Sequence, residues 1–298
     1  MTVVTGYPGY SLVKEVAEVL GAETVEIQEK TFPDGELYVR LCCPEKVVSE
    51  DVVVVSTLYP EQEKRLLKTL LIVNAARVAG AKRVVALVPY LAYSRQDKVF
   101  LQGEPISAQV IVKTFKATGV DVLVTVDVHS PRVLEYFGEV AVNIVVSDIL
   151  VEHALKYLEN PVIMAPDKGA LERAMVAARA HGLEYDYLVK HRDRVTGEVT
   201  YTPKELVIRG RDVVLVDDII STGGTIAEAT RVLLKEGARR VLVAVTHGLL
   251  VEKALEKMVN AGVGRILLAD TLGVKHVHPL VEYVSVTSRI VEELKKVL

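Results

Sequence analysis

The stretch VVLVDDIISTGGTI, residues 213–226, joins an apolar run to two acids, Asp217 and Asp218, and then to a short loop rich in glycine and hydroxyl groups. Glycines allow backbone N–H groups to close around a phosphate, and the N-terminus of the helix expected from residue 226 adds its dipole. The pattern therefore predicts a phosphate site at the carboxyl end of a parallel strand. The loop residues expected to hold the phosphate are Ser221, Thr222, Gly223, Gly224 and Thr225.

The two acids need a different role, because carboxylates pointing at a phosphate would repel it. A carboxylate accepts hydrogen bonds from hydroxyl groups well. Asp217 and Asp218 are therefore expected to bind the other end of the same ligand, either the hydroxyls of a sugar or a magnesium ion on them. The alternative interpretation is an ordinary capped strand-to-helix turn with solvated acids.

Short valine-rich runs alternate with helical patterns along the rest of the chain. Apolar runs such as residues 51–58, 81–91 and 212–219 indicate strands buried on both faces, hence parallel sheet with helices on each side. The intervening residues 66–74 show helical spacing and lead to Gly80 as a stop. The predicted fold is α/β and doubly wound.

The sequence also repeats itself. GAKRV at 80–84 recurs as GARRV at 237–241, DVVVVSTL at 51–58 aligns with DVVLVDDI at 212–219, and the strand at 120–130 parallels that at 263–273. Chance similarity among valine-rich strands is the alternative, but the shared order favours two tandem copies of one domain. We expect domains at 1–143 and 144–280, with a segment of about 281–298 that could pack back on the first. The first copy has STLYP at 56–60 where the second has its acids and loop.

Composition narrows the class of protein. The chain has 298 residues, half of them hydrophobic, and a net charge of −3, so nothing predicts attraction to nucleic acid. No apolar run of about 18 residues predicts a membrane span, and the N-terminus does not have the pattern of a signal peptide. The adjacent Cys42 and Cys43 fit no common metal motif or disulfide framework and suit a reducing cytosol. We therefore expect a cytoplasmic protein.

Thermolabile amides are scarce, with four asparagines and five glutamines in the whole chain. Such depletion, together with abundant valine and charged residues, is typical of proteins from hot environments. The composition therefore suggests a thermophilic source.

Four further segments carry candidate site residues at expected strand ends or turns. FPDGE at 32–36 is by itself an ordinary β-turn pattern, whereas in YLAYSRQDK at 90–98 an arginine and a glutamine follow a buried strand. Asp127-Val-His129 ends another strand, and Asp167 follows a third. In residues 188–197, Lys190 and Arg192 share one face by strand alternation. Taken alone, each segment could instead be purely structural. Residues 90–98 could be a solvated loop, residues 188–197 a solvated hairpin, and His129 a structural histidine.

Taken together, these motifs have a clear resemblance. VDDIISTGGT resembles the phosphoribosyl-diphosphate (PRPP) binding motif that type I phosphoribosyltransferases and PRPP synthases share. The ordered series FPDGE, YLAYSRQDK, TVDVHS, APDKGA and VDDIISTGGT resembles the signatures of PRPP synthases (ribose-phosphate diphosphokinases) over nearly the whole chain. The resemblance implies two tandem type I phosphoribosyltransferase-like domains, the first without its phosphate loop. APDKGA looks more like archaeal members and leaves control by ADP or phosphate open.

The resemblance also implies roles for individual residues. It implies a homo-oligomer in which the adenine-contacting hairpin comes from a neighbouring subunit. It implies Mg²⁺ bound by His129 and Asp167, and catalysis by Lys190 and Arg192 on a loop that closes over ATP. The residues implied to bind ATP are Phe32, Asp34, Gly35, Glu36, Arg95, Gln96 and Asp97.

The implied reaction transfers the diphosphoryl group of MgATP to the C1 hydroxyl of ribose 5-phosphate, giving PRPP and AMP for nucleotide biosynthesis. Two alternatives share the motif. A nucleobase phosphoribosyltransferase would need neither FPDGE nor RQD. A non-catalytic subunit or PRPP-sensing regulator should show eroded site residues or a DNA-binding helix-turn-helix, and the sequence shows neither.

Overall fold

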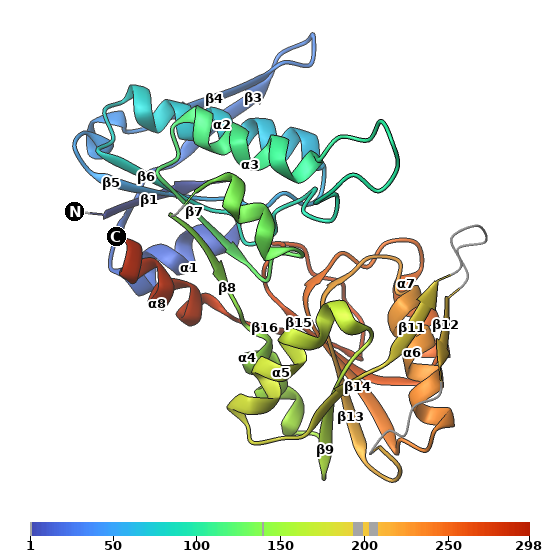
Figure 1. Cartoon of the computed structure of the whole chain (residues 1–298). Helices are drawn as coiled ribbons and strands as arrows, with labels where there is room; N and C mark the ends of the chain where they lie inside the picture. The colour runs from blue at the N-terminus through green and yellow to red at the C-terminus, as the bar shows by residue number, and fades with distance from the viewer. Residues whose placement is uncertain (1, 139, 193–198, 203–207) are drawn as a thin grey trace. The chain divides into compact units, whose positions relative to one another are not determined.

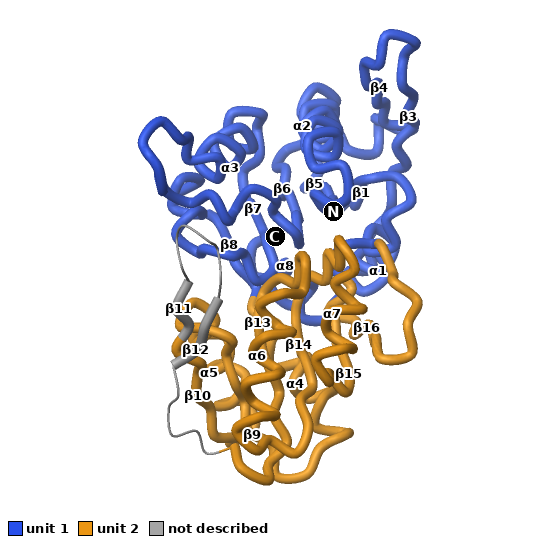
Figure 2. The backbone as a smooth tube through the Cα atoms, turned by 90° about the vertical axis from the view of Figure 1, so that its right-hand side faces the viewer, with its two compact units in different colours: residues 1–144, 271–273, 287–298 blue, residues 145–270, 274–286 orange. Residues whose placement is uncertain are grey.

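The computed structural model describes residues 2–138, 140–192, 199–202 and 208–298, and the side chains of 190–192 and 199–202 lie outside this description. The chain divides into two compact units (Figure 2). Unit 1 comprises Met1–Ile144, Thr271–Gly273 and Thr287–Leu298, and unit 2 comprises Val145–Asp270 and Val274–Val286. Within the described residues, no helix is long and apolar enough to cross a membrane.

Unit 1 is built on a six-stranded parallel sheet in the order β2-β1-β5-β6-β7-β8. α1 and α8 cover one face and α2 and α3 the other (Figure 1). An antiparallel hairpin, β3–β4, extends from the sheet (Figure 1). The element bounds are β1 Thr2–Gly6, α1 Ser11–Leu20, β2 Glu23–Thr24, β3 Ile27–Thr31, β4 Leu37–Leu41, η1 Pro44–Val47, β5 Asp51–Val55, α2 Gln62–Val78, β6 Arg83–Leu87, α3 Ser107–Thr118, β7 Val122–Val126, η2 Pro131–Tyr136, β8 Ala141–Ile144 and α8 Thr287–Val297.

Unit 2 repeats this plan, with a six-stranded parallel sheet in the order β10-β9-β13-β14-β15-β16. α4 packs against α5, and α6 packs against α7, each pair on its own side of the sheet (Figure 1). The element bounds are α4 Ser147–Leu155, β9 Pro161–Ala165, η3 Lys168–Ala170, α5 Leu171–Ala180, β10 Tyr185–Tyr187, β11 Val189–Arg192, β12 Val199–Thr202, β13 Asp212–Ile220, α6 Gly224–Lys235, β14 Arg240–Gly248, α7 Ala254–Asn260, β15 Val263–Ala269 and β16 Val281–Val284.

The two sheets confirm the α/β fold and the internal repeat. β5, β6 and β7 hold the same positions in the first strand order as β13, β14 and β15 in the second. One ion pair is also shared: Asp51 pairs with Arg83 at 3.3 Å, and the equivalent Asp212 pairs with Arg240 at 3.0 Å. Burial alone would raise the pKa of Asp212, but Arg239 and Arg240 hold it well below its usual value. In unit 1 this pair lies at the amino end of β5, which leads to residues 56–60. In unit 2 it lies at the amino end of β13, which leads to residues 221–225.

The last helix of each repeat belongs to the other unit. α4 follows β8 in sequence but packs against α5 and β14 of unit 2. α8 follows β16 but packs against α1 in unit 1, where Ile290 and Leu294 are fully buried. The segment 281–298, expected to act as one piece, is therefore divided. β16 extends the parallel sheet of unit 2 by pairing with β15, and only α8 joins unit 1.

Candidate functional site

The predicted phosphate loop lies between the end of β13 at Ile220 and the start of α6 at Gly224. Gly223 caps α6 with φ 73°, a left-handed conformation that side chains rarely adopt. A Cβ atom at Gly223 would lie 2.9 Å from the carbonyl oxygen of Ala254. Only glycine therefore fits where the loop turns into the helix.

Neighbouring residues hold this loop in place. The backbone N–H of Leu249 donates to the Ile220 carbonyl at 2.9 Å, and that of Val251 donates to the Ser221 carbonyl at 3.1 Å. Lys257 Nζ donates to the Thr222 carbonyl at 3.2 Å. The first turn of α6, all of whose residues the structure describes, has no acidic residue. The loop thus presents a positive helix end, which suits an anion such as a phosphate.

The two acids lie at the end of β13. The backbone N–H of Asp218 donates to Asp217 Oδ1 at 2.9 Å, and the guanidinium of Arg173 lies 3.9 Å from Asp218 Oδ2. Burial of the Asp217 carboxyl and the charge of Asp218 raise the pKa of Asp217 well above its usual value. A carboxylate pair held against this repulsion is suited to a ligand that supplies hydroxyl hydrogens or a cation.

Asp167 lies close to this pair, on the loop after β9. β9 pairs with β13 in the register Met164 to Leu215, so their carboxyl ends lie side by side. Asp167 accepts a hydrogen bond from the Gly169 backbone at 2.8 Å, and its charge adds to the raised pKa of Asp217. His129, which is predicted to bind Mg²⁺ together with Asp167, belongs to unit 1. It follows β7, and its side chain is exposed. Among the described residues, no three acid, histidine or cysteine side chains form a group that could hold a metal ion.

The predicted adenine segment is the turn of the β3–β4 hairpin. The Phe32 N–H donates to the Glu36 carbonyl at 2.8 Å, and Asp34 Oδ1 accepts from the Glu36 N–H at 3.1 Å. Phe32 is 38% exposed, and Lys30 Nζ lies 4.5 Å from its ring centroid. Gly35, with φ 95°, lets the turn close. Asp34, Gly35 and Glu36 also border a hollow of about 860 Å³ against α2.

The second predicted ATP segment, which carries Arg95, Gln96 and Asp97, follows β6. Arg95 is exposed, and Asp97 is partly buried. The Gln96 amide donates to Glu104 at 3.1 Å, and the same carboxylate oxygen accepts two backbone N–H groups, from residues 100 and 101. This bond uses one N–H of the Gln96 amide and fixes the side chain against Glu104.

The backbone of Lys190 and Arg192 lies in β11, which pairs antiparallel with β12. Their side chains lie outside the described part of the chain, as do residues 193–198. Their catalytic roles stay predictions.

Two residues of the site were not predicted from the sequence. Arg173 is only 9% exposed on α5, and a buried arginine on an apolar helix face would have been the signal for it. Lys257 lies 35 residues after Thr222, and no local pattern connects the two.

Two units of one topology, one of them with a strand, an acid pair, a glycine loop and a helix, define a protein of the phosphoribosyltransferase class. Family models agree: residues 1–119 match the N-terminal domain of ribose phosphate pyrophosphokinase, and residues 133–267 match the phosphoribosyl transferase domain. The chain belongs to the ribose-phosphate pyrophosphokinase family.

Individual relatives support this assignment. A ribose-phosphate pyrophosphokinase of Methanopyrus kandleri is 42% identical over 91% of this chain and 92% of its own. One of Sulfurisphaera tokodaii is 38% identical over 91% of this chain and 93% of its own. Phosphoribosylpyrophosphate synthetase from Mycobacterium smegmatis, a solved structure, superposes with a TM-score of 0.89 at 26% identity, covering 99% of this chain and 98% of that one. The resemblance to archaeal members is confirmed.

Proposed function

We propose that this enzyme transfers the diphosphoryl group of MgATP to the C1 hydroxyl of ribose 5-phosphate, giving PRPP and AMP. The observation that carries the proposal is the difference between the two repeats. Unit 2 has the glycine loop and the acid pair, whereas at the same position unit 1 has residues 56–60, STLYP. The duplicated fold therefore offers one sugar-phosphate site and leaves the other copy for a different substrate.

In unit 2 the loop residues 221–225 bind the 5-phosphate, and Asp217 and Asp218 bind the 2- and 3-hydroxyls of the ribose. The uncompensated helix end attracts the phosphate. Asp217 and Asp218 repel each other as carboxylates. Hydrogen bonds donated by the 2- and 3-hydroxyls of the ribose offset this repulsion.

In unit 1 the hairpin turn binds adenine through the ring of Phe32 and through Asp34, Gly35 and Glu36. Arg95, Gln96 and Asp97 bind the remainder of ATP. The exposure of Phe32 and Arg95 leaves both available to a ligand. We include in the proposal a cytoplasmic location and a homo-oligomer in which the hairpin reaches the ATP of a neighbouring subunit.

Magnesium prefers oxygen ligands and takes most of them from phosphates and water, so it needs few protein ligands here; the charge of Asp167 reaches Asp217 and adds to the raised pKa of Asp217. His129 and Asp167 would hold it on the nucleotide. When bound, Mg²⁺ would neutralise part of the negative charge on the phosphates of the nucleotide.

The 1-hydroxyl of ribose attacks the β-phosphorus in line, the new C1–O–P bond forms, and the bond between the α-phosphate and the β-phosphorus breaks to release AMP. The protein positions the reactants and stabilises charge. Lys190 and Arg192 neutralise the diphosphoryl group as it moves.

The test mixes the purified protein with ribose 5-phosphate, MgATP and phosphate and separates the nucleotides. AMP and PRPP formed only with ribose 5-phosphate present would establish the proposal. ADP as the product would indicate another kinase chemistry and refute it. No turnover with PRPP binding retained would favour a nucleobase transferase or a silent subunit, and a panel of nucleobases would separate those two.

A further inference from the structure

The first two turns of α2 contact three segments that are far apart in sequence. Glu63 accepts a hydrogen bond from Tyr93, and Arg65 stacks on the ring of Tyr7. Lys68 pairs with Glu29. Two of the contacted segments are the ones proposed to bind ATP, and the third is the end of β1. This helix start therefore contacts both segments of unit 1 that are proposed to bind ATP: the Arg95 loop, and the hairpin that is proposed to reach the ATP of a neighbouring subunit.

Lys68 fixes the base of the β3–β4 hairpin. It is 5% exposed, and its ammonium group forms an ion pair with Glu29 of β3, three residues before Phe32. It also lies 3.3 Å from the Tyr7 hydroxyl. Burial alone would lower the pKa of Lys68, but Glu29 and Tyr7 raise it above the usual value. Glu29 is 37% exposed, so the pair is only partly buried, but loss of the Glu29 carboxylate would leave the buried Lys68 charge with less compensation.

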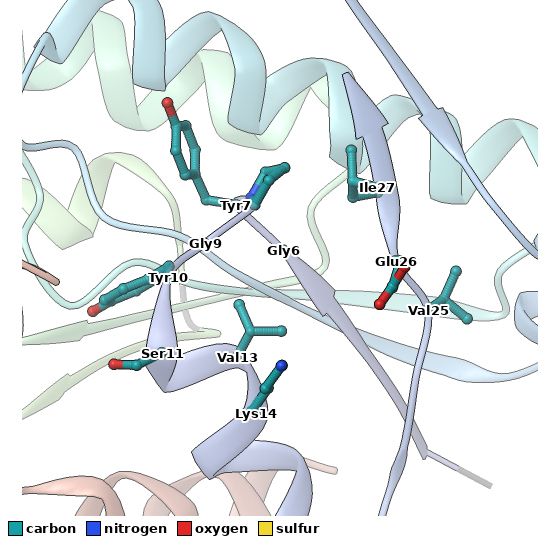
Figure 3. A pocket seen from close by; sticks show the side chains of 11 residues that line it. Gly6, Tyr7, Gly9, Tyr10, Ser11, Val13, Lys14, Val25, Glu26 and Ile27 are labelled. Atoms are coloured by element: carbon teal, nitrogen blue, oxygen red, sulfur yellow. The ribbon is translucent and has the colours of Figure 1, made fainter. Parts of the chain in front are cut away.

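Tyr7 is the second contact. The guanidinium of Arg65 lies 4.0 Å from the ring centroid of Tyr7, and Lys68 Nζ lies 4.6 Å from it. Tyr7 also lines a hollow of about 510 Å³, in which its ring extends away from Lys14 (Figure 3). The cations of α2 therefore contact the Tyr7 ring, and one of them, Lys68, contacts Glu29 of the hairpin as well.

The third contact fixes the Arg95 loop. The hydroxyl of Tyr93 donates to Glu63 at 2.6 Å, and this bond raises the pKa of Tyr93 to about 12. Tyr93 has φ 67°, an uncommon conformation for a bulky residue, and its carbonyl accepts from the Gln96 N–H at 3.1 Å. The bond to Glu63 therefore holds the turn from which Arg95 and Gln96 project.

We propose that Lys68 and Glu63 are positioning residues for ATP, which set the hairpin of Phe32 and the loop of Arg95 from one shared helix. The inference rests on the proposed function, since it assigns a support to the segments proposed to bind ATP. A displacement of about 1 Å in a group that positions a substrate can change rates a hundredfold, so a kinetic effect is expected from losing the part-buried contact of Lys68 with Glu29 or the exposed contact of Glu63 with Tyr93.

The test compares Lys68→Met, which keeps the side-chain length and removes the charge, with Tyr93→Phe, which removes the bond to Glu63. In each variant the KM for ATP should rise roughly tenfold, while the KM for ribose 5-phosphate stays within about twofold. Lys68→Arg should restore part of the loss. Lys113→Met, an exposed lysine on α3, is the matched control and should change neither KM.

A second readout needs no turnover. Hydrogen exchange of the backbone in residues 27–41, measured without ATP, should be faster in Lys68→Met than in the unsubstituted protein and unchanged in Lys113→Met. Unchanged exchange, or a rise of both KM values together, would overturn the positioning role. If the unsubstituted protein makes no PRPP, the proposed function fails, and the exchange data still decide whether Lys68 holds the hairpin.

Discussion

At the scale of single residues, Asp217 shows a conflict between binding and stability. Its pKa is raised in the folded chain, so the folded state holds a proton that the unfolded state loses above about pH 4. Stability contributed by this group therefore falls as pH rises from the ordinary aspartate pKa through the raised one. Ionised Asp217 therefore lowers the stability of the fold, and its proposed role is to bind the ligand.

We expect Asp217→Asn to stabilise the protein at neutral pH and to abolish use of ribose 5-phosphate. The gain should be present at pH 7.5, where the unfolded chain has lost the proton of Asp217, and should vanish near pH 4. Thermal unfolding in a chelator at both pH values measures it, with the exposed Glu252→Gln as control. A lower melting temperature at pH 7.5 would contradict the prediction.

Lys190 supplies the second prediction at this scale. Lys190→Ala should lower kcat about a hundredfold or more, the scale for loss of a transition-state contact, with little change in either KM. Initial rates of AMP formation measure this. Lys253→Ala, an exposed lysine of the same unit, should leave kcat unchanged. Near-normal turnover in Lys190→Ala would remove this residue from the mechanism.

At the scale of elements, the strand, acids, loop and helix could be predicted from residues 213–226 because each depends on local sequence. The supports of the loop could not, because Lys257 and the backbone of residues 249–251 approach it only through the tertiary fold. The hairpin of FPDGE was ambiguous for the same reason. Its turn is common in any protein, and only its attachment to α2 shows what holds it.

Gly223→Ala tests the loop element. The left-handed backbone costs a non-glycine residue about 1–2 kcal/mol, and the Cβ would clash with Ala254. We expect a higher KM for ribose 5-phosphate and a lower melting temperature. Gly210→Ala is the matched control, because Gly210 has the same φ of 73° but open space around its Cβ. Equal effects of the two substitutions on that KM would show that the close approach to Ala254 is unimportant.

At the scale of the whole molecule, the sequence predicted two tandem copies, a second domain that starts at 144 and a segment of about 281–298 that could pack back on the first domain. An amphipathic pattern shows that a helix has an apolar face and does not show which sheet that face covers. The division of this last segment, with β16 in unit 2 and α8 in unit 1, could therefore not be read from the pattern alone.

α8 should be important for the stability of unit 1. Leu294 is fully buried, so Leu294→Ala should lower the free energy of unfolding by about 2–5 kcal/mol. The exposed Lys295→Ala should change it by less than about 0.5 kcal/mol. Denaturant unfolding followed by hydrogen exchange of β7 and β8 locates the loss. Faster exchange in β13 and β14 instead would contradict the assignment of α8 to unit 1.

The low amide content makes a prediction for the whole protein as well. Mesophilic domains melt at about 45–65 °C, and we expect this chain to melt above that range. Calorimetry of the ligand-free protein measures it, and a melting temperature inside the range would contradict a thermophilic source.

The placement of α8 also fixes an order of events on the ribosome. Unit 2 has all its residues once synthesis passes Val286, although most of it is encoded after unit 1. Most of unit 1 is made before unit 2, yet unit 1 lacks its covering helix until Thr287–Leu298 have left the exit tunnel. The half of the chain that is made first is therefore the half that is finished last.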